Sequence, residues 1–282
     1  MVLESLLNPL RAERQPWALV LLGFLYGSLG LFLSLWIFEE QASIVMVFLT
    51  VMAALPLMYQ TLRLEEEKDI MFTQERTILK EHAKAIRFFL MLFLGFVIAY
   101  TTWYVALPFA LAQKVFATQT HTITALNQHV TGALAQIGLV NKIFLNNVKV
   151  LIFCILFSFI YGSGAIFILT WNASVIGAAA GNFIRTHMAQ FADVVGFSKF
   201  ASYLHASSLS IIRYAIHGIP EIMAYFIAGL AGGILSVAII RHDFGTTNFE
   251  KVLLDASDLI LIAIFVLFIA AMLEVFVTPE FF

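Results

Sequence analysis

Three ionisable side chains at spacings of four come just before the glycine-rich apolar stretch 222–240. Arg213, His217 and Glu221 supply a cation, an imidazole and a carboxylate. Such groups at the mouth of a hydrocarbon-length segment are costly unless they are paired or used for function. The stretch could therefore hold a proton or metal site shared by His217 and Glu221, or a structural joint made of hydrogen bonds. Neither possibility names a reaction.

Two backbone geometries are compatible with this spacing. On a straight helix the three side chains would share one face. Gly218 and Pro220 favour a break instead, because proline disfavours helical geometry in the residue before it. We predict that one helix ends near Ile216 and that another begins at Pro220, with Glu221 in its first turn, where a carboxylate complements the helix dipole. His217 is then a polar residue at the hinge.

The sequence favours neither catalysis nor metal binding. Two ligands, His217 and Glu221, are too few for zinc, and the chain contains no His-Glu-x-x-His motif and no glycine-rich phosphate loop. Residues 161–164 (Tyr-Gly-Ser-Gly) resemble the turn of an intramembrane serine nucleophile, but no histidine spacing supports a base for it. We therefore expect no enzymatic activity, no cofactor and no bound metal.

The composition is that of a polytopic membrane protein. Hydrophobic residues make up 61% of the chain and charged residues 12%, with a mean hydropathy of +0.92, whereas a soluble domain is about half apolar and a quarter charged. The near balance of 16 basic and 18 acidic residues gives no sign of nucleic-acid binding. The single cysteine, Cys154, excludes an intrachain disulfide. The charged start lacks a convincing cleavage site, which predicts a retained N-terminus rather than a cleaved signal peptide.

The apolar stretches predict an all-α transmembrane bundle, because each is near the roughly 20 residues that a helix needs to cross. We expect one integral membrane domain, residues 1–282, with six spans and one ambiguous segment. That segment, at about 174–184, is short enough to be re-entrant. The expected spans are 17–38, 44–62, 88–107, 148–171, 219–240 and 259–277.

The segments between these spans predict the topology. Residues 63–87 carry six basic side chains, so we expect them in the cytoplasm as helical extensions of the flanking spans. They form either a solvated hairpin or a docking surface for a cytoplasmic protein. The N-terminus is then cytoplasmic, and 109–142 is an extracytoplasmic loop with amphipathic helices. The C-terminus lies outside if 174–184 crosses and inside if it is re-entrant.

Small residues and asparagines mark the expected helix contacts. In lipid, close approach over glycine is a main source of helix packing, so the glycines predict either tight internal packing or a subunit interface, with Gly229 as the first interface candidate. Asn147 is a candidate helix cap, whereas Asn172 could begin a half-helix that builds a binding site. The packing glycines are Gly23 with Gly27, Gly177 with Gly181, Gly229 with Gly233, and Gly162.

The order of these features carries a family resemblance. It consists of Asn146-Asn147, Gly162 and Gly164, Asn172 with Gly177 and Gly181, then His217-Gly218-x-x-Glu221 with Ala228, Gly229 and Gly233. Over about residues 144–240 the chain resembles the stage II sporulation protein M family, although Ile216 and Ala173 stand where the family has Pro and Gly. The resemblance implies an integral membrane protein without established enzymatic activity. In endospore formers the family is linked to an assembly that remodels cell wall and membrane, and many relatives occur in organisms that do not sporulate.

We therefore expect a non-enzymatic scaffold or membrane-remodelling protein of the cell membrane. It would contact the lipid bilayer, form a homo-oligomer with a dimer favoured, and offer its cytoplasmic face to protein partners. The alternative is a transporter or channel with a polar site at Asn172, Arg213, His217 and Glu221. Glu274, near the end of the last span, is expected to be an interfacial carboxylate with no special role.

Overall fold

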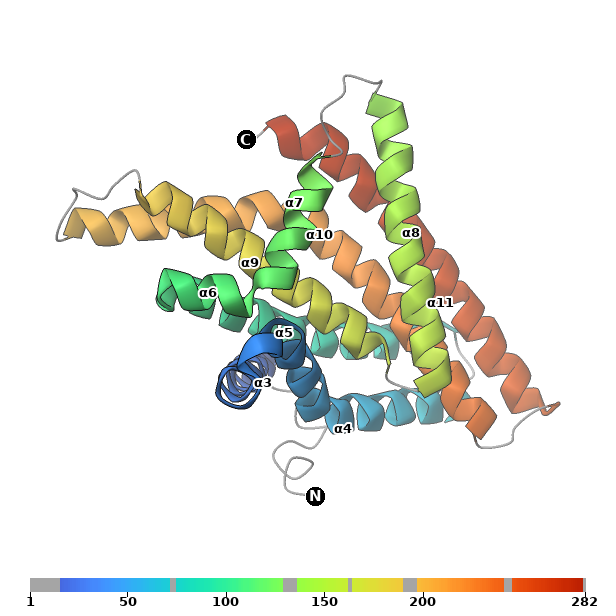
Figure 1. Cartoon of the computed structure of the whole chain (residues 1–282). Coiled ribbons are helices and arrows are strands. Elements are labelled where there is room, and N and C mark those ends of the chain that lie inside the picture. Colours follow the sequence, from blue (N-terminus) through green and yellow to red (C-terminus); the bar gives the residue numbers. More distant parts are fainter. Residues whose placement is uncertain are drawn as a thin grey trace.

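The computed structural model describes residues 16–71, 75–128, 136–161, 164–189, 197–240 and 245–280, and every secondary-structure element in these ranges is helical (Figure 1). This confirms the predicted all-α class. The long helices are α3 (Pro16–Ile37), α4 (Ala42–Met71), α5 (Glu75–Ala106), α8 (Gln136–Tyr161), α9 (Ala165–Ala189), α10 (Phe197–Ile240) and α11 (Thr247–Met272). The short elements are η1 (Glu39–Gln41), α6 (Phe109–Val115), α7 (Ala117–Gln128), the π-helix η2 (Leu273–Val277) and η3 (Thr278–Glu280).

Within the described ranges, 7 helices are long and apolar enough to cross a membrane. The prediction of six spans and one ambiguous segment agrees with this number, with the ambiguous segment as the seventh span. This span is Ala165–Met188, which contains the whole of 174–184, so this segment is part of a full-length helix and not a re-entrant piece. An odd number of crossings would put Pro16 and Glu280 on opposite faces of the membrane.

The connection between α8 and α9 lies earlier than predicted. The sequence suggested one span over 148–171, but α8 ends at Tyr161 and α9 begins at Ala165. A side chain on Gly164 would clash with the Phe157 carbonyl oxygen, so glycine permits the tight turn. The Ser158 hydroxyl accepts a hydrogen bond from the Ala165 N–H at 3.3 Å, which satisfies one of the open amides at the start of α9.

Helix α10 is continuous over 44 residues, so the predicted break between Ile216 and Pro220 is wrong. Proline removes one backbone donor and hence one intrahelical hydrogen bond. Ending a helix inside a membrane would instead leave several backbone groups without partners. The continuous helix leaves fewer groups unsatisfied, and it places His217 and Glu221 one turn apart on a shared face.

Helices α3 and α5 cross with their backbones in close contact, because glycines line the crossing. A Cβ atom on Gly23 would clash with the Leu92 carbonyl oxygen and would lie 3.1 Å from the Cα atom of Gly95. One turn along, a Cβ atom on Gly27 would lie 3.0 Å from the Cβ atom of Ala99. Since contact in lipid depends on such close approach, these glycines fix α3 against α5.

The short helices α6 and α7 lie within the predicted amphipathic region 109–142, and α7 ties α4 to α9. The Gln119 side chain is fully buried. Its oxygen accepts from the Ser43 hydroxyl at 2.8 Å, and its amide donates to the Ser174 hydroxyl at 3.1 Å. Buried polar groups of this kind are stabilising only when their partners are in place, so the three side chains lock three helices together.

A salt bridge joins α6 to the turn between α3 and α4. The Lys114 amine lies 3.0 Å from a carboxylate oxygen of Glu39 and 3.0 Å from one of Glu40. The hydrogen bonds to Glu40 and Glu39 raise the pKa of Lys114, so the amine stays protonated. Because the two carboxylates are exposed to solvent and the lysine is half-buried, this contact orients the turn more than it stabilises the fold.

Candidate functional site

The predicted ionisable cluster lies at a joint between α8, α10 and the C-terminal end of the chain. Glu221 accepts a hydrogen bond at Oε1 from the Tyr225 hydroxyl at 2.8 Å, one turn further along α10. The buried Asn147 amide, on α8, lies close enough to the Glu221 carboxyl to donate a second bond. The carboxyl group is therefore held between two helices.

His217 connects α10 to η3. Its Nδ1 atom lies 3.1 Å from the Thr278 hydroxyl oxygen. The Thr278 hydroxyl itself donates to the Leu273 carbonyl oxygen at 3.2 Å. Its oxygen is then the acceptor for His217, and we assign the ring proton to Nδ1.

Glu274 lies in the π-helix η2, beside this joint. The sequence suggested an interfacial carboxylate with no special role, and in the structure Glu274 is within electrostatic range of Glu221. Single turns of π-helix inside α-helices are frequent at functional sites. Two carboxyl groups, a tyrosine hydroxyl and an amide can hold a proton or orient one another, and here they come from three different parts of the chain.

A small cavity lies further along α10, with space for about one water molecule. Most of its lining is apolar, and the exception is the Ser158 hydroxyl on α8. The side chains and glycine around it are Met58, Leu62, Phe89, Ser158, Ala165, Leu169, Phe226, Gly229 and Leu230. A space of this size and polarity suits a single trapped water better than a solute.

Asn172, another residue of the predicted polar site, does not join this cluster. Asn172 lies inside α9, where its amide donates to the Ile168 carbonyl oxygen at 2.9 Å. The prediction that a half-helix begins at Asn172 is therefore wrong, since the asparagine is satisfied within a continuous helix. The Arg213 side chain and Gly162 lie outside the described residues. No group of three metal-ligating side chains occurs in the described ranges.

Gly229, the first candidate for a subunit interface, packs inside the chain. A Cβ atom there would lie 2.8 Å from the Cβ atom of Ala165, and Gly233, one turn on, is also buried. Two glycines of α9 approach two tyrosines of α5 in the same way: Gly177 with Tyr100 and Gly181 with Tyr104. These glycines serve contacts between helices of one chain and leave no open glycine face at these positions.

Two members of the joint, Tyr225 and Thr278, were not predicted from the sequence. Tyr225 stands four residues after Glu221, a spacing that would have identified it had the helix been expected to continue through Pro220. Thr278 is 61 residues from His217, and no local pattern indicates that contact.

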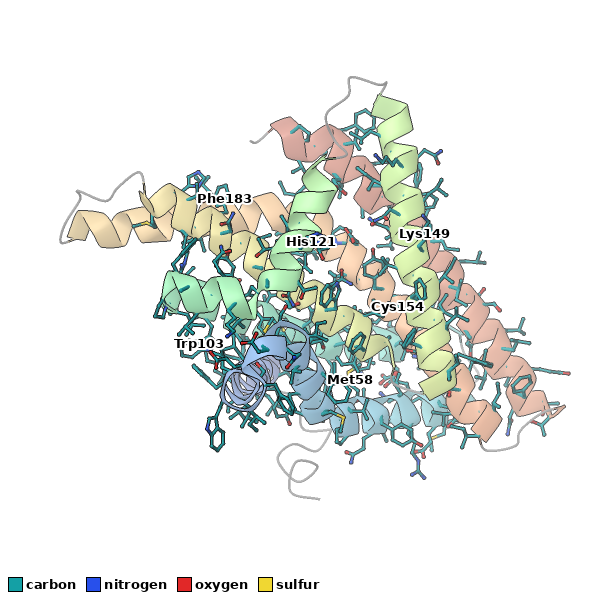
Figure 2. All side chains as sticks on the ribbon, in the orientation of Figure 1. Met58, Trp103, His121, Lys149, Cys154 and Phe183 are labelled. Carbon is teal, nitrogen blue, oxygen red and sulfur yellow. The ribbon has the colours of Figure 1, made fainter. Side chains whose placement is uncertain are left out.

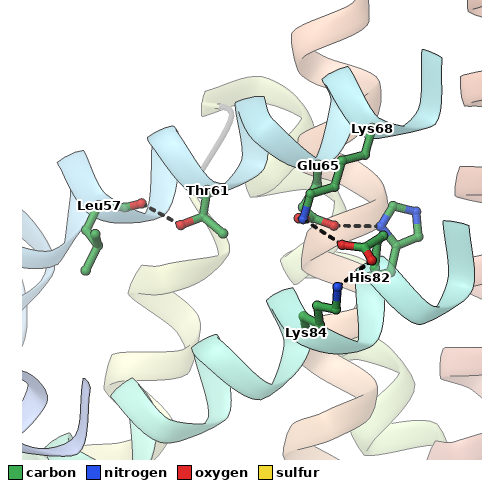
Figure 3. A network of polar contacts seen from close by, with 7 residues as sticks. Leu57, Thr61, Glu65, Lys68, His82 and Lys84 are labelled. Carbon is green, nitrogen blue, oxygen red and sulfur yellow. Dashed lines mark hydrogen bonds and ion pairs between the residues drawn. The ribbon is translucent and has the colours of Figure 1, made fainter. Parts of the chain in front are cut away.

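A second polar cluster holds the ends of α4 and α5 together (Figure 3). Glu65 is fully buried, and its two carboxylate oxygens contact His82 Nδ1 at 3.1 Å and the Lys68 amine at 2.6 Å. Lys68 also lies 3.4 Å from Glu81. In the described parts of 63–87 both spans continue as paired helices, and a buried ion-pair network lies between them.

Comparison with known proteins agrees with the expected family. The family model described as Stage II sporulation protein M matches residues 84–279. The match runs from α5 to η3 and includes the joint formed by Asn147, His217, Glu221 and Thr278. No curated protein and no solved structure matches the chain. With most of its length matched and at least seven hydrophobic helices, this integral membrane protein belongs to the stage II sporulation protein M family.

Proposed function

We propose that this protein is a non-enzymatic scaffold or membrane-remodelling protein of the cell membrane. In this proposal the start of α3 faces the cytoplasm, and η3 lies on the opposite side. The observation that carries it is the joint itself, in which Glu221 bonds to Asn147 of α8 and His217 bonds to Thr278 of η3. Because the Glu221 carboxyl and the His217 imidazole are used to hold helices in place, we assign them a structural role and not a catalytic one.

A scaffold has to keep one shape while it organises partners. The described helices are linked by three independent devices: the Glu221 joint, the Glu65 network and the glycine crossing at Gly23. Together these reach α3, α4, α5, α8, α10 and η3. The proposed cytoplasmic ends of α4 and α5, with their mixed charges, offer a surface for protein partners.

The first experiment separates structure from transport at the joint. His217→Ala and Glu221→Ala should lower the yield and thermal stability of folded protein in lipid nanodiscs, because each leaves a partner side chain unsatisfied. Glu250→Ala, on the exposed side of α11, is the control and should behave as the wild type. If both joint variants fold, assemble and transport as the wild type does, the joint serves neither role.

A transporter or channel is the second candidate, because the Glu221 and Glu274 carboxyl groups lie within electrostatic range of each other in apolar helices. Ionisable groups inside a membrane often mark proton or ion paths. This function predicts that Glu221→Gln folds normally and loses flux, measured in proteoliposomes with a pH-sensitive dye and with ion-selective dyes. Normal folding together with lost flux would replace the scaffold proposal.

A further inference from the structure

We infer that α8 and α11 form a two-fold interface with a second copy of this chain, in which Lys149 of each copy pairs with Asp258 of the other. The inference rests on the proposed function, because it names the surface through which a self-associating scaffold would assemble. It replaces the glycine face around Gly229, which is used within the chain.

Helices α8 and α11 are the least covered of the membrane helices. In their most apolar windows 22% and 28% of the residues are buried, against 44% to 83% in the other five. The large apolar side chains on their uncovered sides include Leu145, Ile152, Leu156, Leu254, Leu261 and Phe265. Lipid tails can cover an apolar surface, so the apolar side chains do not by themselves indicate a protein partner. The charged residues on these two surfaces do.

Lys149 lies on the uncovered side of α8, at the middle of its span (Figure 2). It is eleven residues from each end of Gly138–Ile160, which is about 16 Å along a helix. A lysine side chain is too short to bring its amine to the headgroups over that distance unless the helix is strongly tilted. Lys149 makes no hydrogen bond or ion pair with any part of the chain that the structure describes.

Asp258 presents the opposite charge on the uncovered side of α11. It directly precedes the apolar stretch 259–273 and is exposed. It too has no hydrogen bond or ion pair within the described ranges. Its carboxylate, at the edge of the apolar stretch, carries the charge that Lys149 needs in a partner. One second copy supplies both missing partners at once, because a two-fold interface is self-complementary.

The depths of the two charges allow this pairing. Helices α8 and α11 run antiparallel, and the Phe144 and Phe268 rings, with centroids 5.8 Å apart, define a common level. Lys149 lies five residues and Asp258 ten residues from that level in the same direction, or about 7.5 and 15 Å along their helices. A two-fold axis along the membrane normal preserves depth. The difference, about 7.5 Å, can be bridged by an extended lysine side chain.

Charge exchange between two co-expressed variants tests the interface. Lys149→Glu alone and Asp258→Lys alone each place like charges at both contacts of a dimer. A mixed dimer of the two variants has opposite charges at both contacts. We expect a dimeric wild type, monomers for each variant alone, and recovery of the dimer as the mixed species when differently tagged variants are co-expressed and co-purified in lipid nanodiscs. Recovery also shows that each variant can fold.

A control variant and the pattern of results distinguish a wrong interface from a wrong charge pairing and from the absence of self-association. Lys80→Glu, an exposed charge on α5, should remain dimeric. A wild-type dimer that both variants leave unchanged overturns this interface but leaves self-association standing. Co-expressed variants that do not associate overturn the Lys149–Asp258 pairing. A monomeric wild type overturns both the interface and the homo-oligomer that the sequence led us to expect.

Discussion

The Tyr225 hydroxyl and the Glu221 carboxylate meet at 2.8 Å, one turn apart on α10. Tyr225 is fully buried, so its hydroxyl has no access to water. The contact exists because α10 continues through Pro220. It directs the carboxyl group toward Asn147 on α8 and makes a local pair into a link between helices.

Removing the Tyr225 hydroxyl should weaken this link. In Tyr225→Phe the carboxyl group of Glu221 loses its donor while the aromatic packing is kept, and the expected loss of stability is about 1–3 kcal/mol. Thermal unfolding of the purified protein in detergent measures it. Tyr59→Phe, at a position 40% exposed on α4, is the matched control and should change little. Equal unfolding temperatures for the two variants would contradict a structural role for the hydroxyl.

The glycine crossing of α3 and α5 should not tolerate a methyl group. Gly23→Ala would place its Cβ atom against the Leu92 carbonyl oxygen, and overpacking of this kind costs about 1–3 kcal/mol. Gly218→Ala is the control, because nothing lies within 4 Å of its new Cβ atom. That variant should be neutral or stabilised by up to about 1 kcal/mol, since alanine favours a helix. Gly23→Ala should therefore unfold at a lower temperature than Gly218→Ala, and the reverse order would contradict the close crossing of α3 and α5.

The buried carboxylate at the ends of α4 and α5 should matter far more than its exposed neighbour. Glu65→Ala leaves His82 and Lys68 without their shared acceptor, and breaking a buried ion pair costs about 3–5 kcal/mol. Glu67→Ala removes a half-exposed pair with Arg63 at 3.5 Å, worth roughly 0–1 kcal/mol. Chemical denaturation in mixed micelles compares the two. Similar losses would mean that the network is solvated.

The link through α7 predicts a local effect rather than a global one. Gln119→Ala leaves the Ser43 and Ser174 hydroxyls without this buried partner, so α7 should open more often. Hydrogen exchange of the α7 amides should accelerate several-fold while exchange in α5 stays slow. His121→Ala, at an exposed position of the same helix, controls for changes in helix propensity. Unchanged exchange in Gln119→Ala would show that other contacts hold α7.

The span count predicts the placement of the two described ends. With seven crossings, cysteines introduced at Pro16 and at Glu280 in a Cys154→Ala background should react with a membrane-impermeant thiol reagent from opposite sides. Sealed vesicles of known orientation provide the measurement. Labelling of both positions from the same side would require an even number of crossings.

Much of the architecture follows from composition and periodicity. Apolar stretches of hydrocarbon length have only a few stable forms in lipid, and helices satisfy their own backbone groups. The all-α membrane class and the helical extensions in 63–87 were therefore predictable, whereas the family was predicted from its resemblance in the order of asparagines, glycines and the His217–Glu221 element. The role of Gly23 in close helix packing was also predicted from the sequence, although its contact with Leu92 and Gly95 of α5 was not.

Helix continuity was harder to predict. Pro220 and Asn172 both suggested breaks, because local propensity treats them as helix breakers. In the folded chain the Asn172 amide bonds back to Ile168, and α10 passes through Pro220 without ending. Each outcome depends on the free-energy cost of leaving backbone N–H and C=O groups unsatisfied in the membrane. A local sequence pattern does not include that cost.

The sequence by itself determined the class of this protein, its hydrophobic helices, its ionisable residues and its family, because these depend on side-chain chemistry along one chain. Only the tertiary structure decided that Gly229 packs against Ala165, that His217 reaches Thr278, and that Lys149 and Asp258 stay on uncovered surfaces. Those relationships depend on how distant helices cross and rotate. Such angles are set by the packing of all the side chains together, so no single segment contains them.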